Sequence, residues 1–148
     1  MRLVLQRVSS AKVQSDNLVS KIGKGLVALV AISDNDNEKD IEFAAKKTAS
    51  LRIFSNNEGK MDLSVYDIKG EVLSIPQFTL YGDCRKGRRP DFTESAGKKK
   101  ARDYFELYTD KIKQEKVKVK TGFFGASMKL KLVNDGPVTI IVDTNKRK

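Results

Sequence analysis

Short runs of alternating or continuous apolar residues cover much of the chain and predict a fold rich in β-strands. Positions 2–8 alternate apolar and polar residues as a half-buried strand does, and positions 11–15 and 18–22 flank Asp16-Asn17 as the two arms of a hairpin. The continuous apolar run at 26–32 predicts a central strand. Further strands are expected at 51–54, 71–81, 117–120, 128–133 and 138–142.

Two other segments carry apolar residues at helical spacing. Ser33 to Asn37 supplies turn and N-cap candidates, and the pattern that follows predicts a helix near 38–50. A second helix is predicted at about 98–115 by the apolar stripe Ala101, Tyr104, Phe105, Tyr108 and Ile112. We interpret these aromatics as core residues rather than stacking partners for RNA bases, because this spacing is typical of packing against a sheet. The pattern therefore predicts an α+β protein, mainly antiparallel with two helices, in a single domain over residues 1–148.

The composition excludes several classes of catalytic site. The sequence has no histidine and a single cysteine, Cys84, which removes Ser-His-Asp and Cys-His triads and zinc sites built from histidine or thiolate. Its acids show no ligand-like clustering, so we expect neither a metal nor another cofactor. There is no run of the ~20 apolar residues that a membrane span needs, and the first residues follow a strand pattern rather than a signal peptide. We therefore expect a cytoplasmic protein without a membrane partner.

Positive charge is concentrated in one part of the chain. The formal net charge is +10, and residues 83–102 contain eight Lys or Arg against three acids. Arg85, Lys86, Arg88 and Arg89 surround Gly87 directly after an apolar strand, an arrangement that suits contacts with phosphates. A solvated charged face is the alternative interpretation. Because the arginines adjoin so apolar a strand, we favour RNA contact.

Four stretches of sequence resemble one known family. They are Met1-Arg2-Leu3-Val4-Leu5-Gln6-Arg7-Val8, Gln77-Phe78-Thr79-Leu80-Tyr81-Gly82-Asp83, Gly122-Phe123-Phe124-Gly125-Ala126-Ser127-Met128 and Asn134-Asp135-Gly136-Pro137-Val138-Thr139. In this order they resemble the D-aminoacyl-tRNA deacylases, also called D-Tyr-tRNA deacylases, over essentially the whole chain. The resemblance implies a barrel-like core, a homodimer with its active site at the subunit interface, and hydrolysis of the ester bond of D-aminoacyl-tRNA and of glycine mischarged on alanine tRNA.

Pro76 departs from the family pattern, which usually has serine immediately before Gln-Phe-Thr. Proline has neither a hydroxyl group nor a backbone N–H. A related deacylase branch carries Pro-Gln-Ala-Thr, so Pro76 indicates relaxed selectivity, whereas Phe78 and the motif at 134–139 favour the main branch.

The resemblance makes Gln77, Phe78 and Thr79 the expected catalytic residues. An aminoacyl ester is already activated, so its hydrolysis needs a positioned water and donors for the oxyanion, which backbone N–H groups and the Gln77 amide can supply. Without histidine, covalent attack by Thr79 is the weaker option, and Thr79 or the ribose 2′-OH of the substrate is left to assist the water. The alternative for Gln77 and Thr79 is a hydrogen-bonded pair inside a sheet.

Four further residues are expected to bind the substrate. Gly136-Pro137 resembles the family's Gly-cisPro element, which inserts into the partner subunit's active site and leaves no room for an L side chain; glycine would not clash, so selectivity would be rejection of L-residues. The sequence alone leaves the isomer open and predicts a turn between two strands there. Phe124 and Met128, by resemblance, border the pocket, with an ordinary core role as the alternative. A noncatalytic RNA-binding domain is the competing function.

Overall fold

The 14-residue strand β1 (Arg2–Ser15) is the axis of the computed structural model, which describes residues 1–146. Its first half pairs with β3 (Gly25–Ala31) and its second half with β2 (Leu18–Ile22), both antiparallel. Along its other edge β1 pairs with β8 (Lys129–Asp143), also antiparallel. The strand therefore exchanges one partner for another partway along its length.

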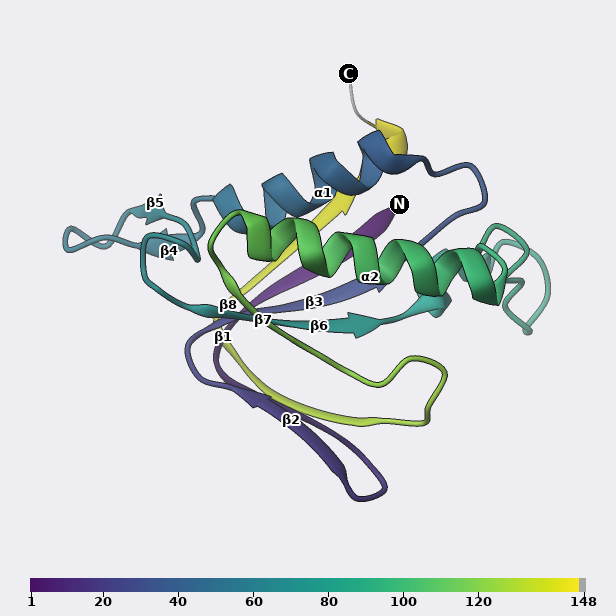
Figure 1. Cartoon of the computed structure of the whole chain (residues 1–148), viewed down its shortest axis with the longest axis horizontal. Coiled ribbons are helices and arrows are strands. Elements are labelled where there is room, and N and C mark those ends of the chain that lie inside the picture. Colours follow the sequence, from purple (N-terminus) through teal and green to yellow (C-terminus); the bar gives the residue numbers. More distant parts are fainter. Residues whose placement is uncertain (147–148) are drawn as a thin grey trace.

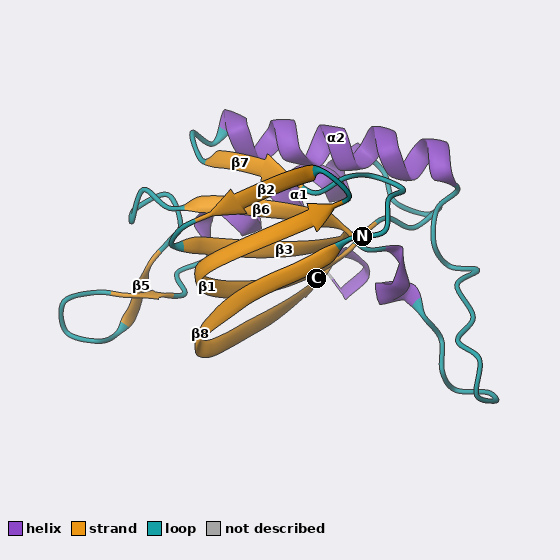
Figure 2. Ribbon diagram, turned by 90° about the horizontal axis from the view of Figure 1, so that it is seen from below, coloured by secondary structure: helices purple, strands orange, loops and turns teal. Residues whose placement is uncertain are grey.

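The remaining large strands extend the sheet on the side of β3. Their order is β2-β1-β3-β6-β7, with β8 beside β1. Strands β6 (Glu71–Pro76) and β7 (Lys118–Thr121) join in parallel, so the sheet is mixed, although most of its pairs are antiparallel as predicted. Figure 2 shows how strongly this sheet curves, which gives the expected barrel-like form. A small hairpin, β4 (Phe54–Ser55) with β5 (Met61–Leu63), stands apart.

Two α-helices cover one face of the sheet in the described part of the chain (Figure 1). They are α1 (Glu38–Ser50) and α2 (Lys98–Gln114), close to the predicted ranges. Helix α1 begins with a capping box, in which the Asn37 side chain accepts a hydrogen bond from Lys39 N and the Asp40 carboxylate accepts one from Asn37 N. Helix α1 connects β3 to β6, and α2 connects β6 to β7, so the two helices supply the crossovers that these parallel pairs require. Neither helix has the length and apolar character of a membrane span.

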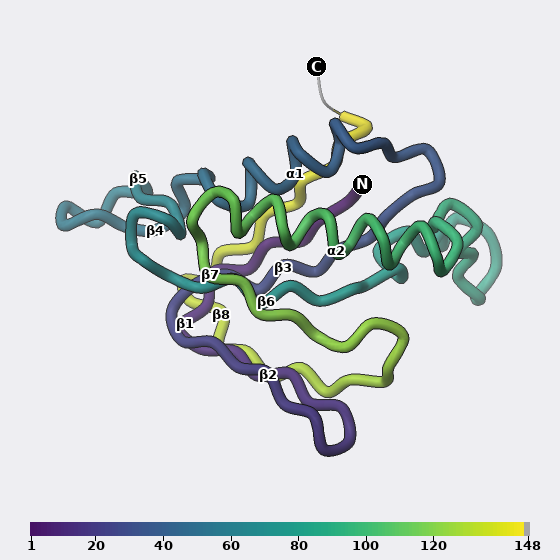
Figure 3. The backbone as a smooth tube through the Cα atoms, viewed as in Figure 1, coloured from purple at the N-terminus to yellow at the C-terminus, as the bar shows by residue number. Residues whose placement is uncertain are grey.

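The core consists of two clusters on opposite faces of the curved sheet. One lies between sheet and helices and includes Leu3, Leu5 and Phe105. The other includes Val13 and Leu73 and lies where β1, β2 and β8 swing away from β3 and β6, as the tube in Figure 3 shows. The aromatic stripe of α2 packs in or against the first cluster, which confirms its interpretation as core.

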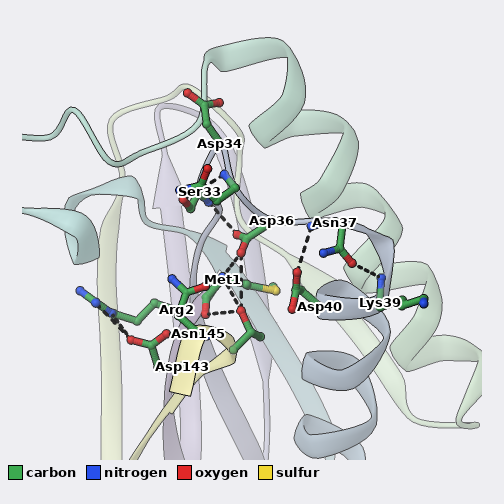
Figure 4. A network of polar contacts seen from close by, with 12 residues as sticks. Met1, Arg2, Ser33, Asp34, Asp36, Asn37, Lys39, Asp40, Asp143 and Asn145 are labelled. Carbon is green, nitrogen blue, oxygen red and sulfur yellow. Dashed lines mark hydrogen bonds and ion pairs between the residues drawn. The ribbon is translucent and has the colours of Figure 1, made fainter. Parts of the chain in front are cut away.

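A buried polar network fixes the first residue between two distant segments (Figure 4). The Met1 ammonium group donates hydrogen bonds to the Asp36 carboxylate and, over 2.6 Å, to Thr144 Oγ1. Asp36 also accepts from Ser33 N at 2.7 Å, and Met1 O accepts from Thr144 N at 2.9 Å. The network joins the start of β1, the loop before α1 and the segment after β8.

The strand predicted at 71–81 is wrong beyond Pro76. Residues Phe78–Tyr81 form a 3-10 helix, η1. Pro76 is the last residue of β6 in register with β3, opposite Val30, and Gln77 N donates to Val30 O at 2.7 Å. The chain then leaves the ladder, so Gln77 and the residues after it project from the end of the strand instead of lying within the sheet.

The strands predicted at 128–133 and 138–142 are present, but they belong to the single strand β8, so the turn predicted between them at Asn134-Asp135-Gly136 is wrong. Residues on both sides of the motif pair with β1: Asn134 lies opposite Val8 and Thr139 opposite Gln6. The longer spacing on β8 makes the motif a bulge rather than a reversal. Of the strand predicted at 51–54, only Phe54 lies in a strand, the two-residue β4, and β5 was not predicted.

The helices are joined by a buried hydrogen bond of 2.7 Å between Thr48 Oγ1 and the Tyr108 hydroxyl group. We predict that Tyr108→Phe lowers the free energy of unfolding by about 1 kcal/mol, because one buried hydrogen bond is lost while the ring stays. The midpoint of urea unfolding measures this change. Tyr66→Phe, at a hydroxyl on a half-exposed ring, is the matched control and should leave the midpoint unchanged. Equal midpoints for both variants would contradict the prediction.

Candidate active site

The Gln77-Phe78-Thr79 motif lies where β6 turns into η1. The Gln77 side-chain amide donates a hydrogen bond to Thr79 Oγ1, and Gln77 O accepts from Leu80 N at 3.2 Å. Phe78 is 56% exposed, which is unusual for so large an apolar side chain. The Gln77–Thr79 hydrogen bond of the alternative interpretation therefore exists, but the pair lies at the open end of a strand rather than inside a sheet.

Arg2 fixes the other end of η1. Its Nη1 atom donates to Leu80 O at 2.8 Å, its guanidinium lies 4.8 Å from the centre of the Tyr81 ring, and it pairs with Asp143 at 3.1 Å. Burial raises the pKa of the Tyr81 hydroxyl above its usual value, and the nearby acids Asp36 and Asp143 raise it further. Sequence reasoning did not single out Arg2, and its place in the N-terminal motif was the only signal for it.

A cavity of about 710 Å³ opens beside the motif. Four of the expected site residues line it, namely Gln77, Phe78, Phe124 and Met128. Helix α2 contributes Ala101 and Phe105 to the wall, neither of which was predicted as a site residue. Thr79 adjoins the cavity through its hydrogen bond with Gln77. The volume lies within the range of small-molecule sites, so the expected residues converge on a space that can hold a ligand.

The loop between β7 and β8 forms one wall of this cavity because glycine lets it approach β6 closely. A Cβ on Gly122 would lie 3.0 Å from both Ile75 Cδ1 and Met128 Sδ. The Met128 sulfur also accepts a hydrogen bond from Phe123 N at 3.3 Å. Met128 is thus held at the cavity by its own loop.

Gly136 and Pro137 lie outside this cavity in the same chain. Both residues are exposed, the peptide bond between them is cis, and Gly136 has a φ of +121°, which favours glycine. Within the bulge, Asn134 Nδ2 donates to Thr139 Oγ1 at 3.0 Å, and Asn134 Oδ1 accepts from Val138 N at 3.2 Å. The bulge is a formed structure that points to solvent rather than to its own chain's site.

Arg7, on β1, fixes this bulge by a hydrogen bond to its backbone. Its Nε atom donates to Asp135 O at 3.0 Å, and its Nη1 atom donates to Ile53 O at 2.8 Å. A Cβ on Gly136 would lie only 2.7 Å from Arg7 Nη2. Arg7 is buried, but neither its burial nor its contacts with these distant carbonyl groups can be read from the alternating pattern of β1, so sequence reasoning did not identify it as a positioning residue.

Comparisons with known proteins agree with these motifs. The family model described as D-Tyr-tRNA(Tyr) deacylase matches residues 4–143. The chain belongs to this family. The D-aminoacyl-tRNA deacylase of Thermosipho melanesiensis is 51% identical over 148 residues, with 99% of each chain covered. A solved structure named c-Myc DNA Unwinding Element Binding Protein has a TM-score of 0.90 and 34% identity, covering 97% of this chain and 98% of that one. Another, of a probable eukaryotic D-amino acid tRNA deacylase, has a TM-score of 0.79 and 19% identity, over 95% of this chain and 97% of that one, and supports the fold.

Pro76, where this member departs from the family's usual serine, lies at the cavity wall. Its ring is 3.6 Å from the position of a Cβ on Gly122, so it packs against the loop that carries Met128. The family's serine hydroxyl is therefore replaced here by an apolar surface.

The predicted cationic residues lie in an exposed loop before α2. An antiparallel bridge between Asp83 and Asp91 closes the base of this loop, and Gly87 adopts a φ of +68° within it. The Arg85 side chain donates to both Asp83 carboxylate oxygens. Within residues 1–146, Lys86, Arg88 and Arg89 form no ion pair with an acid. Three of the four predicted cations are thus available to an external anion.

Within residues 1–146, no cluster of three or more His, Cys, Asp or Glu residues could hold a metal ion.

Arg85 should control the titration of Asp83. Hydrogen bonds from Arg85 lower the pKa of the Asp83 carboxyl to about 2, so the pair is fully formed above the usual carboxyl pKa of about 3.9 and is lost as the pH falls through about 2. We predict that Arg85→Ala moves the midpoint up toward 3.9, about its usual value, as followed by carboxyl ¹³C NMR. Arg88→Ala is the control and should leave it near 2, its value in the unaltered protein. A midpoint unaffected by Arg85→Ala would contradict this pairing.

Proposed function

We propose that the protein hydrolyses the ester bond between a D-amino acid and the 3′ end of tRNA in the cavity beside Gln77. Membership of the deacylase family supports this reaction and makes aminoacyl-tRNA the substrate partner. The observation that carries the choice of site is that two separate motifs converge on one cavity of about 710 Å³, the first through Gln77 and Phe78 and the second through Met128.

The geometry of Thr79 supports attack by water rather than by the protein. Its oxygen accepts the hydrogen bond from Gln77, so its own proton is directed to the substrate or to a water molecule. Within the described residues, no basic side chain that could remove this proton is hydrogen-bonded to Thr79 Oγ1, and the sequence has no histidine. Thr79 therefore orients the reactants, and the ribose 2′-OH is available to assist the water.

The start of η1 supplies donors for the negative charge that develops on the ester oxygen. The first amides of a helix have no acceptor within the helix, so the N–H groups of Phe78 and Thr79 can point to a bound carbonyl. Because such donors are fixed before the reaction, they stabilise a tetrahedral intermediate without reorganisation. This mechanism requires no metal or other cofactor.

A second copy of the chain completes the site. Gly136 and Pro137 are exposed on the bulge of β8 and lie outside the cavity of their own chain, which leaves them free to enter another. The sheet face opposite the helices carries an apolar stripe across β3, β1 and β8, formed by Leu29, Val4 and Ile141, and Ile141 is 69% exposed. Packing these faces around a twofold axis buries the stripe and brings each Gly136-Pro137 to the partner's cavity.

This arrangement selects by shape. The backbone of Gly136-Pro137 would occupy the space of an L side chain, while D-amino acids and glycine would fit. The free cations Lys86, Arg88 and Arg89 would contact the tRNA beyond the cavity. Acting as one domain in the cytoplasm, the protein would correct mischarged tRNA before translation.

The substrate preference is tested with D-Tyr-tRNA, L-Tyr-tRNA and glycyl-tRNA, following loss of each ester. We predict that the D-tyrosyl and glycyl esters are hydrolysed, with the L-ester slower by roughly a hundredfold or more because its side chain meets fixed backbone. Loss of neither tyrosyl ester above the buffer rate would support the noncatalytic RNA-binding alternative. Equal loss of the D- and L-tyrosyl esters would remove the chiral filter from the mechanism.

Mixing two defective variants tests whether the site is shared between subunits. Gly136→Ala should be inactive because its Cβ intrudes at the bulge, and Gln77→Ala with Thr79→Ala should be inactive at the cavity. After subunit exchange we predict recovery of about one quarter of the wild-type rate, since half of the dimers are mixed and each has one intact site of two.

Gly23→Ala is the matched control, because no atom lies within 4 Å of a Cβ at that position. It should be fully active alone. Mixed dimers confirmed by native mass spectrometry but without recovered activity would contradict the shared site.

A further inference from the structure

The first turn of α2 carries an unusual concentration of positive charge. Lys98, Lys99 and Lys100 are consecutive, Arg102 follows one turn after Lys98, and the first turn contains no acid. The N-cap residue Gly97 offers no side-chain hydrogen bond. Cations at a helix N-terminus are unfavourable because they add to the positive end of the helix dipole. These charges therefore lower the stability of the first turn of α2.

These cations differ in their partners. Lys99 pairs with Asp103 at 2.7 Å, and Lys100 donates to Asp34 O and lies over the Tyr104 ring. Lys98 and Arg102 form no ion pair with an acid anywhere in residues 1–146. The two unpaired cations are four residues apart and therefore lie on the same side of α2.

That side of α2 borders the cavity. Lys98 is part of the cavity wall, and its Cε atom is 3.8 Å from the position of a Cβ on Gly125 in the loop opposite. The Arg102 guanidinium lies 5.1 Å from the centre of the Phe124 ring, which also lines the cavity. Within residues 1–146, Lys99 and Lys100 are thus engaged by Asp103 and by the Asp34 carbonyl, whereas the side chains of Lys98 and Arg102, the two cations beside the cavity, form neither an ion pair nor a hydrogen bond.

We propose that Lys98 and Arg102 bind the phosphate group that links the last two nucleotides of tRNA, and so position the terminal, esterified nucleotide in the cavity. This proposal rests on the function proposed above. The reacting ester is on the ribose of the terminal nucleotide, so the nearest anion of the substrate is the phosphate on that ribose's 5′ side. An ammonium and a guanidinium group on one helix face provide charge-assisted donors for it.

The assignment separates two kinds of RNA contact. The loop carrying Lys86, Arg88 and Arg89 is outside the cavity wall and would contact phosphates farther along the acceptor strand. Lys98 and Arg102 would instead fix the distance between a phosphate and the Gln77-Phe78-Thr79 motif. Their loss should weaken binding even for a ligand that consists of the terminal nucleotide alone.

The test uses 3′-deoxy-3′-(D-alanylamino)adenosine, whose amide bond resists hydrolysis, with and without a 5′-phosphate. Calorimetry on the wild-type protein should give about tenfold tighter binding for the phosphorylated compound. Lys98→Gln with Arg102→Gln should abolish this preference and leave the affinity for the unphosphorylated compound unchanged. Both side chains are exposed, so the variant should fold, and its melting temperature should be equal to or slightly above that of the wild type because two cations leave the helix N-terminus.

Lys99→Gln is the matched control, because Lys99 lies in the same helical turn but pairs with Asp103. This variant should keep the tenfold preference, about the wild-type value. A wild-type protein that does not distinguish the two compounds, or a double variant that still does, would overturn the proposal while leaving the deacylase function intact. If the wild type hydrolyses D-aminoacyl-tRNA but binds neither compound, both the cavity assignment and this proposal fail.

Discussion

The exchange of partners along β1 is the constraint on which the rest of the molecule depends. Buried backbone groups must be hydrogen-bonded, and β1 meets this requirement with β3 over its first half and β2 over its second. The sheet consequently divides, and its lower part swings away from β3 and β6 (Figure 3). The cavity opens beside this division, between β6, α2 and the loop that leads into β8. Its position is set by strand pairing rather than by the residues that line it.

The same strand places both functional segments through two arginines. Arg2 binds the carbonyl group of Leu80 at the end of η1, and Arg7 binds the carbonyl group of Asp135 in the bulge. Both segments are irregular, and each leaves the regular ladder at the residues that we propose to be functional. Hydrogen bonds from charged donors to backbone carbonyls are well suited to fix such segments. If η1 serves the cavity of its own chain and the bulge serves that of a second copy, as proposed above, β1 would couple the two sites of a dimer.

The sequence predicted the regular elements well and the irregular ones poorly. Apolar periodicity located both helices, because capping at Asn37 and the stripe through Tyr108 are local signals. It extended β6 through Tyr81, since apolar residues in a 3-10 helix resemble a strand in composition. It also read the Gly136-Pro137 bulge as a turn, because only pairing of both flanks with β1 distinguishes the two. Arg2, Arg7, Lys98 and Arg102 depend on contacts between distant segments, so no local pattern could assign their roles.

A crystal structure of the protein bound to a non-hydrolysable D-aminoacyl adenosine amide is the most direct measurement of the central claim. The account predicts that the adenosine occupies the cavity beneath α2 and that the amide carbonyl faces the N–H groups of Phe78 and Thr79. Gly136 and Pro137 from a second chain should contact the α-carbon of the amino acid. A ligand bound in the cavity with its α-carbon exposed to solvent, and with no second chain near it, would contradict the shared chiral site.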